Sequence, residues 1–371
     1  MERIRIAQIV GDARLGGVSR CVLQYFESVD RDRFAFDFIT YGPAETDAKI
    51  RALGGNVLFI PPLTNVVSSH AALERLLREG EYDIVHSHMT TLSAIALHAA
   101  EKAGAKVRIC HAHSTIMPEC EHKAVKKILR PLCVRNATHL AACSVFAAEN
   151  IFRDRAKDAF ILKNAVDTER FANAGEKEAS KKALGLSGMV FLFLGRFAAQ
   201  KNLCFLIRAF GEFLKRGGDG TLVLTGCGRE EENMRKLIRD RSLENRVRIF
   251  PPADNTQDYY AAADAFCLPS LYEGLPIVAV EAQAAGVPGV YSAEITREAD
   301  LLPGNVFLPV GKGDESQWAD CFLKLYRERE SAGKCGASLP SAARMAALGD
   351  AGYEIRTAAG ALERYYEGLL R

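Results

Sequence analysis

Short apolar runs rich in β-branched residues alternate with longer amphipathic stretches along most of this 371-residue chain. Strands that are apolar on both faces, separated by helices, predict parallel sheets covered by helices on both sides. In the first half, strands are predicted at 4–10, 34–40, 57–60, 83–86, 107–111 and 139–143, with helices at 18–28, 69–78, 92–102 and 122–135. In the second half, strands are predicted at 190–194, 221–225, 247–250, 265–268, 287–291 and 306–309, with helices at 203–216, 230–241, 275–285 and 316–329.

Two such series predict an α/β protein with two doubly wound domains, because the chain is too long for one ordinary core. We expect an N-terminal domain over 1–170, a C-terminal domain over 171–352 and a last helix over 353–371 that packs back towards the first domain. Strand signals lapse between 173 and 188, where we place the join. Open parallel sheets bind ligands at the carboxyl ends of their strands, so two facing sheets would share one cleft.

The composition excludes several other classes of protein. Hydrophobic residues make up 48% and charged residues 25%, and a net charge of +2 gives no reason to expect a nucleic-acid partner. No apolar run approaches the ~18–20 residues needed to span a bilayer, and the chain opens on a strand pattern without a signal-peptide layout. The ten cysteines form no Cys-x-x-Cys pair. They read as buried free thiols of a cytoplasmic protein rather than as a zinc site or a disulfide framework.

Two features follow predicted strands of the first half. Gly11 to Gly17 form a glycine-rich turn before a helix, where free backbone N–H groups suit an anion, although a plain tight turn explains them equally well. His86 and His88 end one strand, and His111 and His113 end the next. Histidines that cap strands with satisfied hydrogen bonds are the simpler interpretation, and no Asp or Glu accompanies them as a metal ligand. Two pairs at one sheet edge nevertheless favour a polar cleft over a packed core.

The second half carries cations and carboxylates at corresponding places. Arg196 and Lys201 follow the first strand and precede a helix, which suits a diphosphate, and the alternative is two surface cations without a fixed partner. Glu273 stands just before a predicted helix and Glu281 more than one turn inside it. A carboxylate in an apolar helix is costly unless it is paired, and the vicinal hydroxyls of a ribose would supply two donors. Helix capping explains Glu273 but not Glu281.

Glu273 and Glu281, eight positions apart around Gly-Leu-Pro, resemble the Glu-x7-Glu signature of retaining glycosyltransferases of family 4, which have the GT-B fold. The resemblance covers nearly the whole chain and departs from the usual residues at Ala165 and Cys227. Its other motifs are Gly16-Gly17-Val-Ser-Arg20, His113, Asn164-Ala-Val-Asp167, Gly195-Arg196 with Lys201, Gly226-x-Gly228 and Ala263-Asp264. It implies two Rossmann-like domains that face a cleft.

The resemblance also implies a role for each matching residue. Arg196 and Lys201 would neutralise the donor diphosphate, Glu273 would contact the donor sugar and Glu281 the ribose, and His113 would lie near the reacting sugar. The remaining donor-binding positions implied are Gly16, Gly17, Gly195, Gly226, Gly274, Leu275 and Pro276. No metal ion, cofactor or protein nucleophile is implied, since the nucleotide-sugar is a substrate. The acceptor is expected to attack on the face that the diphosphate leaves, so that anomeric configuration is retained.

The expected function is therefore metal-independent hexosyl transfer from a nucleotide-diphospho-sugar, with UDP favoured, to a saccharide or lipid-linked saccharide in capsular, exopolysaccharide or cell-surface glycan synthesis. A non-catalytic nucleotide-sugar-binding module and an epimerase on the same fold are the alternatives. An NAD-dependent dehydrogenase is disfavoured because the Gly-x-Gly-x-x-Gly fingerprint is missing.

A basic amphipathic helix is predicted in the first half. If it contacts lipid, the protein would lie peripherally on the inner face of a membrane. Apolar residues recur there at helical spacing, and either an anionic membrane surface or solvent could face the helix. Its basic residues are Lys123, Lys126, Lys127 and Arg130.

Overall fold

The computed structural model describes residues 3–12, 16–117, 122–332 and 339–371. The chain forms two compact units, and each contains one parallel sheet. Unit 1 comprises the chain up to Ala165 together with Ile355–Arg371, and unit 2 comprises Val166–Glu354. The predicted α/β class with two doubly wound parallel sheets is confirmed, with seven strands in one sheet and six in the other.

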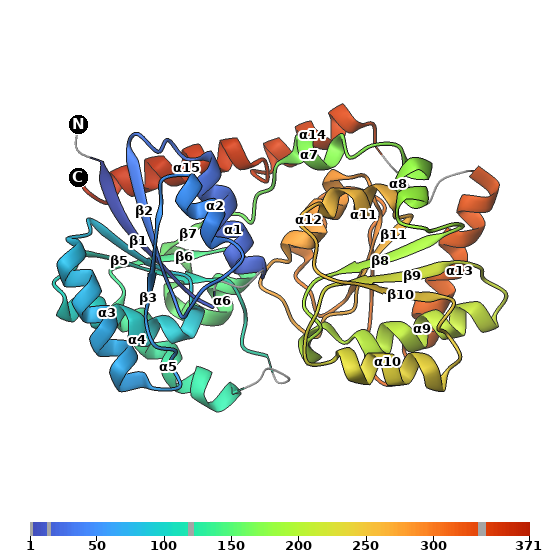
Figure 1. Cartoon of the computed structure of the whole chain (residues 1–371), viewed down its shortest axis with the longest axis horizontal. Helices are drawn as coiled ribbons and strands as arrows, with labels where there is room; N and C mark the ends of the chain where they lie inside the picture. The colour runs from blue at the N-terminus through green and yellow to red at the C-terminus, as the bar shows by residue number, and fades with distance from the viewer. Residues whose placement is uncertain (1–2, 13–15, 118–121, 333–338) are drawn as a thin grey trace. The chain divides into compact units, whose positions relative to one another are not determined.

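The sheet of unit 1 has the order β3-β2-β1-β4-β5-β6-β7, and every neighbouring pair is parallel. The strand order reverses between β1 and β4, which is where open α/β sheets bind their ligands. Helices α1 and α15 lie on one face and α3, α4 and α5 on the other (Figure 1). The strands are β1 (Ile4–Gly11), β2 (Phe34–Thr40), β3 (Asn56–Phe59), β4 (Ile84–Ser87), β5 (Val107–Ala112), β6 (His139–Ala142) and β7 (Ala159–Ile161). The helices are α1 (Gly17–Ser28), α2 (Asp47–Ala52), α3 (Val66–Gly80), α4 (Ser93–Lys102), α5 (Lys123–Asn136), α6 (Val145–Phe152) and α15 (Ile355–Gly368).

The last helix, α15, contributes to the core of unit 1. Tyr366 is buried against the rings of Phe34 and Phe36, with ring centroids 6.2 Å away in each case. At its outer side, Glu363 accepts a hydrogen bond of 2.7 Å from the backbone N–H of Asp30. These contacts join the two ends of the chain within one unit.

The sheet of unit 2 has the order β10-β9-β8-β11-β12-β13 and is also parallel throughout. Its order reverses between β8 and β11. Helices α11 and α12 cover one face and α9, α10 and α13 the other (Figure 1). The strands are β8 (Val190–Leu194), β9 (Thr221–Thr225), β10 (Val247–Phe250), β11 (Ala265–Leu268), β12 (Gly289–Ser292) and β13 (Val306–Leu308). The helices are α7 (Thr168–Ala172), α8 (Lys177–Ala183), α9 (Leu203–Lys215), α10 (Glu231–Asp240), α11 (Thr256–Ala262), α12 (Ile277–Ala284), α13 (Glu315–Ala332) and α14 (Ser341–Asp350).

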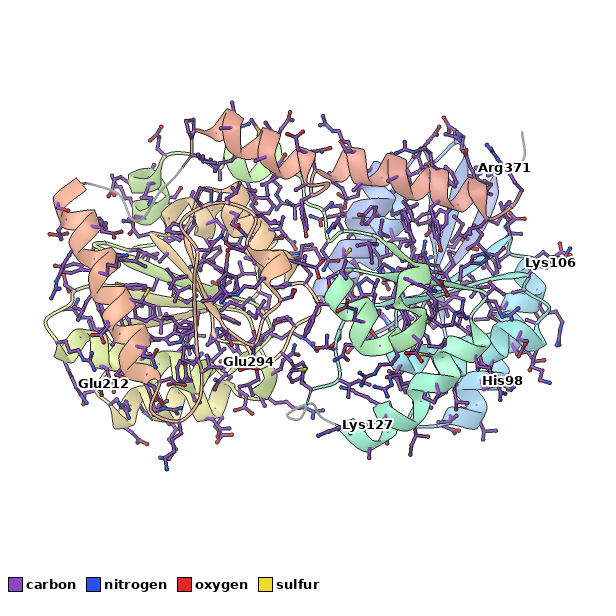
Figure 2. The ribbon with its side chains drawn as sticks, turned by 180° about the vertical axis from the view of Figure 1, so that it is seen from behind. His98, Lys106, Lys127, Glu212, Glu294 and Arg371 are labelled. Carbon is purple, nitrogen blue, oxygen red and sulfur yellow. The ribbon has the colours of Figure 1, made fainter. Side chains whose placement is uncertain are left out.

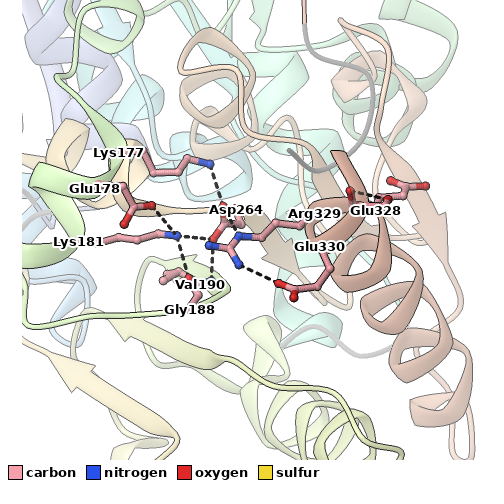
Figure 3. A network of polar contacts seen from close by, with 10 residues as sticks. Lys177, Glu178, Lys181, Gly188, Val190, Asp264, Glu328, Arg329 and Glu330 are labelled. Carbon is pink, nitrogen blue, oxygen red and sulfur yellow. Dashed lines mark hydrogen bonds and ion pairs between the residues drawn. The ribbon is translucent and has the colours of Figure 1, made fainter. Parts of the chain in front are cut away.

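Asp264, immediately before β11, is the centre of a buried ion-pair network (Figure 3). Its carboxylate accepts hydrogen bonds of 2.8 Å from Lys181, 2.9 Å from Lys177 and 2.9 Å from the N–H of Val190, and Arg329 lies 3.4 Å away. The Lys181 side chain is only 1% exposed. Burial by itself would raise the pKa of Asp264, but the charges and hydrogen bonds of Lys177 and Lys181 lower it overall.

This network explains why the stretch 173–188 is polar without being a linker. The chain passes between the units at Ala165 and Val166, and the polar stretch lies within unit 2, where α8 supplies Lys177 and Lys181. Sequence reasoning also passed over β7, because this strand is short and half-buried and follows the polar segment Arg153–Asp158.

Candidate functional site

Two glycine turns form the carboxyl edge of the unit 2 sheet. Gly195 follows β8, and its N–H donates to the backbone carbonyl oxygen of Thr225 at 3.0 Å. Gly226 follows β9, and its N–H donates to the carbonyl oxygen of Phe250 at 3.0 Å. A Cβ on Gly226 would lie 2.0 Å from the carbonyl oxygen of Gly195, and Gly226 has a φ of +149°. Only glycine permits backbones to approach this closely in that conformation. The packing of one loop on the next thus requires the glycine predicted at Gly226, and the φ of +149° at Gly195 favours glycine there.

The loop after β8 is joined to the loop after β11. The short helical turn Ala199–Lys201 places Lys201 Nζ 2.5 Å from Glu273 Oε1, and these side chains are 14% and 10% exposed. The side-chain amide of Gln200 donates to the carbonyl oxygen of Tyr272 at 2.7 Å, and the backbone carbonyl oxygen of Gln200 accepts the N–H of Leu271 at 2.8 Å. Two residues predicted separately for the donor site therefore form one ion pair. Gln200, which orients this pair, carries no sequence motif and was missed.

Arg196 lies in the same loop but is exposed, and within the described residues it has no ion pair or hydrogen bond through its guanidinium group. Because the charge of Lys201 is offset by Glu273, Arg196 carries the uncompensated positive charge of this loop. A guanidinium with five donors in a fixed plane suits the oxygen atoms of a phosphate.

Helix α12 begins at Ile277, two residues after the predicted start, and Pro276 is the residue that precedes it with φ −73°. Gly274, Leu275 and Pro276 are buried at this helix end. The first N–H groups of a helix have no partner within the helix and favour an anion. Glu273 immediately precedes this segment. The loop cations and the helix end thus follow β8 and β11, the two strands between which the sheet order reverses.

Glu281 is fully buried on α12. The hydroxyl of Tyr260, from α11, lies 2.9 Å from its Oε2 atom and is a donor to it. The expectation that this carboxylate needs a donor is correct, but in this structure a protein side chain supplies one. Contact with a ribose stays a prediction.

Two further buried hydroxyls at this sheet edge, those of Thr225 and Ser270, have no hydrogen-bond partner within the described part of the chain, and the sequence reasoning did not single them out.

In unit 1, the predicted glycine loop is only partly described. Residues 13–15 lie outside the described ranges, while Gly16 precedes α1 in an extended conformation and Gly17 is its first residue. The carbonyl oxygen of Gly16 accepts the N–H of Arg20 at 3.0 Å, as expected at a helix start. The structure therefore places both glycines at the N-terminus of α1 and leaves their role as a prediction.

The four histidines at the ends of β4 and β5 form one cluster, but it is mostly core. His86, His88 and His111 are buried, whereas His113 is half-buried. The expectation of a polar cleft at all four is therefore wrong, because the rings stack on one another: His86 on His88 at 4.2 Å and His111 on His113 at 3.8 Å. Burial lowers the pKa of all four, that of His113 to about 3, so each is neutral at pH 7.

This cluster has the ligand count of a metal site but not the geometry of one. One ring nitrogen from each of His86, His88 and His111 lies within 4.8 Å of the others. Most of the ring nitrogens, however, point at one another, at Tyr366 or at Gln8 in hydrogen bonds. Stacked rings that share hydrogen bonds do not converge their lone pairs on one point, as a tetrahedral ion requires. We therefore treat the cluster as a neutral hydrogen-bonded network.

The basic helix is α5. Three of its apolar side chains follow helical spacing and are exposed: Val125 by 50%, Ile128 by 67% and Leu132 by 37%. Lys127 is exposed beside them (Figure 2). An apolar stripe flanked by cations is typical of a helix that lies on a membrane surface. None of the helices in the described ranges is both long enough and apolar enough to cross a bilayer.

Comparison with known proteins identifies the class of enzyme. Residues 15–170 match the family described as Glycosyltransferase Family 4, and residues 188–328 match Glycosyl transferases group 1. The chain is 30% identical to the putative glycosyltransferase EpsF of Bacillus subtilis, over 86% of this chain and 87% of the relative. It is 28% identical to the UDP-Gal:alpha-D-GlcNAc-diphosphoundecaprenol alpha-1,3-galactosyltransferase of Escherichia coli, over 78% and 79%.

The fold agrees with these matches. Anabaena HepE, solved in complex with UDP-glucose, superposes with a TM-score of 0.82 at 18% identity, over 98% of this chain and 99% of that one. The fold and the matched sequences define a GT-B glycosyltransferase that takes its sugar from a nucleotide-sugar. The chain belongs to glycosyltransferase family 4, in group 1 of these enzymes.

Proposed function

We propose that this enzyme moves a hexose or an N-acetylhexosamine from a UDP-sugar to a hydroxyl of a saccharide or lipid-linked saccharide, with retention of anomeric configuration, in polysaccharide or cell-surface glycan synthesis. The observation that carries the proposal is the group formed by Arg196, the Lys201–Glu273 pair and the start of α12 at one sheet edge of unit 2. The names of two comparison proteins support the choice of donor: one is solved with UDP-glucose, and the other uses UDP-Gal.

In this reaction the bond between the anomeric carbon and the diphosphate oxygen breaks, and a bond to the acceptor oxygen forms on the same face. The acceptor's proton passes to an oxygen of the departing diphosphate. Negative charge develops on that diphosphate, and fixed positive groups stabilise it most when they are already oriented. Arg196, Lys201 and the N–H groups at the start of α12 can do this without a metal ion, so we propose that transfer is metal-independent.

Glu273 has two tasks in this proposal. Its Oε1 atom holds Lys201, while Oε2 lies 3.4 Å from the side-chain nitrogen of Gln200 and can also accept a hydrogen bond from a hydroxyl of the donor sugar. A carboxylate only accepts hydrogen bonds, so it favours a donor sugar that presents a hydroxyl group to it. Residues after β11 thus connect sugar recognition to diphosphate binding.

The acceptor proposal rests on α5 and on the name of one relative. That relative acts on a diphosphoundecaprenol-linked sugar. In the present chain the exposed apolar stripe of α5, bordered by basic residues, suits an anionic lipid surface. We therefore propose that the enzyme works peripherally on a membrane that carries its acceptor.

The test measures binding and release separately. Thermal stabilisation by a panel of UDP-sugars, with GDP-mannose as a comparison, identifies the donor, because a ligand at 100 times its dissociation constant adds ~2.7 kcal/mol to stability. UDP release with lipid-linked saccharides, with and without EDTA, then measures transfer. Stabilisation by no nucleotide-sugar would contradict the proposal. Stabilisation without release under any acceptor would identify a binding module, and loss of release in EDTA would refute metal independence.

A further inference from the structure

Gln8, His88 and His113 are connected by hydrogen bonds in the interior of unit 1. Gln8 lies on β1, while His88 and His113 follow β4 and β5. The Oε1 atom of Gln8 is 2.7 Å from Nε2 of His88, and Nδ1 of His88 is 2.9 Å from Nε2 of His113. Gln8 is 1% and His88 6% exposed, so no solvent competes for these atoms. The chain of contacts ends at His113, whose Nδ1 has no hydrogen bond within the described residues.

The orientation of the Gln8 amide determines which atom donates in each of these hydrogen bonds. Its nitrogen donates to the hydroxyl of Tyr366 at 3.1 Å, which leaves the oxygen facing His88. An amide oxygen only accepts, so Nε2 of His88 must carry a proton. His88 is neutral, because burial lowers its pKa well below the usual value, and its Nδ1 is therefore an acceptor. That acceptor requires the proton of His113 to lie on Nε2, which leaves Nδ1 of His113 unprotonated.

Two other contacts hold the arrangement in place. The hydroxyl of Tyr366 is 2.7 Å from Nδ1 of His86, which supplies an acceptor for its proton and so favours the amide nitrogen of Gln8 as its donor. The backbone N–H of His113 donates to the hydroxyl of Thr90 at 3.1 Å, which fixes the strand end that carries the ring. Reversal of the Gln8 amide would exchange donor and acceptor in each hydrogen bond from Gln8 through His88 to His113. One buried amide therefore controls the tautomer of His113, two hydrogen bonds away.

We propose that Gln8 is a positioning residue that acts through His88 to hold His113 as the Nε2–H tautomer, with Nδ1 turned into a hydrogen-bond acceptor for a hydroxyl of the transferred sugar. This inference rests on the proposed function and on the role that the family resemblance implies for His113, near the reacting sugar. A neutral acceptor binds a sugar hydroxyl without adding a positive charge of its own. A mixture of tautomers would present a donor to part of the bound sugar and lower its occupancy in the reactive orientation.

The experiment measures the tautomer directly. The full-length chain is labelled with ¹⁵N-histidine, and two-bond ¹H–¹⁵N correlations distinguish Nδ1–H from Nε2–H, with the His113→Gln variant assigning the signal. Wild type is expected to show His113 as Nε2–H at pH 7.5. Gln8→Leu and Tyr366→Phe are expected to show a mixture, because the acceptor or its anchor is lost. Gln8→Glu keeps an acceptor facing His88 and is expected to keep the Nε2–H form, even if Gln8→Leu folds poorly.

Kinetics supply the second readout. Gln8→Leu is expected to lower kcat roughly 5–10-fold, the size expected for one neutral hydrogen bond, with little change in UDP affinity. Gln8→Glu is expected to recover most of kcat and to lose activity at a higher pH than wild type on acidification, because its carboxylate raises the pKa of His88. His98→Gln, which breaks the separate His70–His98 contact of 2.9 Å on α3 and α4, is the control and should change neither readout.

The outcomes separate this inference from the proposed function. An Nδ1–H signal for His113 in wild type, or an unchanged tautomer in Gln8→Leu, would overturn the role of Gln8. A normal kcat in His113→Gln would overturn it too, by removing His113 from sugar binding, even where UDP-sugar transfer itself is intact. If wild type showed the expected tautomers but transferred sugar from no donor, the result would instead count against the proposed function.

Discussion

The ammonium group of Lys201 lies 2.5 Å from a carboxylate oxygen of Glu273, although 72 residues separate them in the chain. The pair joins the loop after β8 to the loop that precedes α12. It therefore holds a cation and a carboxylate at a fixed distance before any ligand binds. Preorganisation of this kind is worth most where charge develops during a reaction.

Replacement of Lys201 by alanine is expected to lower turnover by roughly 10²–10³, the usual loss when one donor to a developing negative charge is removed. The variant also removes the positive charge that Lys201 places beside Glu273, so this carboxylate would repel the diphosphate more strongly. UDP release at saturating donor measures the effect. Lys215→Ala, which removes an exposed lysine paired with Glu212 on α9, is the control. Near-normal rates in Lys201→Ala would exclude this role.

Replacement of Glu281 by glutamine is expected to weaken UDP binding by about 1.5–3 kcal/mol, because the amide removes the negative charge and replaces one of the two acceptor oxygens with a donor. Tyr260→Phe removes the protein donor that lies 2.9 Å from this carboxylate and tests the competing structural role. Calorimetric titration with UDP, together with thermal unfolding, distinguishes a role of Glu281 in nucleotide binding from a structural role. If Glu281→Gln lowered stability as Tyr260→Phe does while UDP affinity stayed normal, Glu281 would belong to the core alone.

Replacement of Asp264 by asparagine is expected to destabilise unit 2 by about 3–5 kcal/mol, the usual consequence of leaving a buried charge without its partner. Lys181 carries most of this effect, since its side chain is 1% exposed, whereas that of Lys177 is 44% exposed and screened by solvent. The fluorescence of Trp318, the single and fully buried tryptophan, follows the unfolding of unit 2 in urea. Asp219→Asn, at an exposed pair with Arg246, should change the midpoint very little.

Acid is expected to destabilise unit 1 through its buried histidines. Burial lowers their pKa in the folded state, so the unfolded chain binds protons below about pH 6.5 that the folded chain does not. Stability is therefore retained above that pH and falls by about 1.4 kcal/mol per pH unit for each such histidine as the pH drops. Circular dichroism should report a loss of structure on acidification before the fluorescence of Trp318 changes. Coincident transitions at every pH would argue against a separate origin in unit 1.

The sequence predicted the central strands of unit 2 well because each is a continuous apolar run that ends where glycine, proline or polar residues begin. Strands β8, β9, β10 and β11 have the predicted bounds. Helices α7 and α8 were passed over because their side chains are polar, and what fixes α8 is a distant carboxylate, Asp264. Local periodicity cannot show such a partner.

The site shows the same division between local and distant causes. Each of Arg196, Lys201 and Glu273 was predicted from residue type and its place beside a strand or helix. Their pairing could not be predicted, because it depends on which strand ends the sheet order brings together. Glu281 illustrates the limit most clearly: its need for a donor follows from the apolar sequence around it, but the donor, Tyr260, lies 21 residues earlier on another helix.

Charge reversal on α5 tests the proposed membrane contact. Substitution of Lys123, Lys126, Lys127 and Arg130 by glutamate is expected to abolish co-sedimentation with anionic vesicles, because each basic residue near such a surface contributes about 1 kcal/mol. Ile128→Ser, which removes the most exposed apolar side chain of the helix at 67%, is expected to weaken binding while leaving its salt dependence intact. Reversal of the surface residues Lys215, Arg235 and Lys236 in unit 2 is the control. Binding that is insensitive both to salt and to reversal on α5 would show that another surface contacts the lipid, whereas loss of binding with unchanged transfer to a water-soluble acceptor would separate membrane attachment from chemistry.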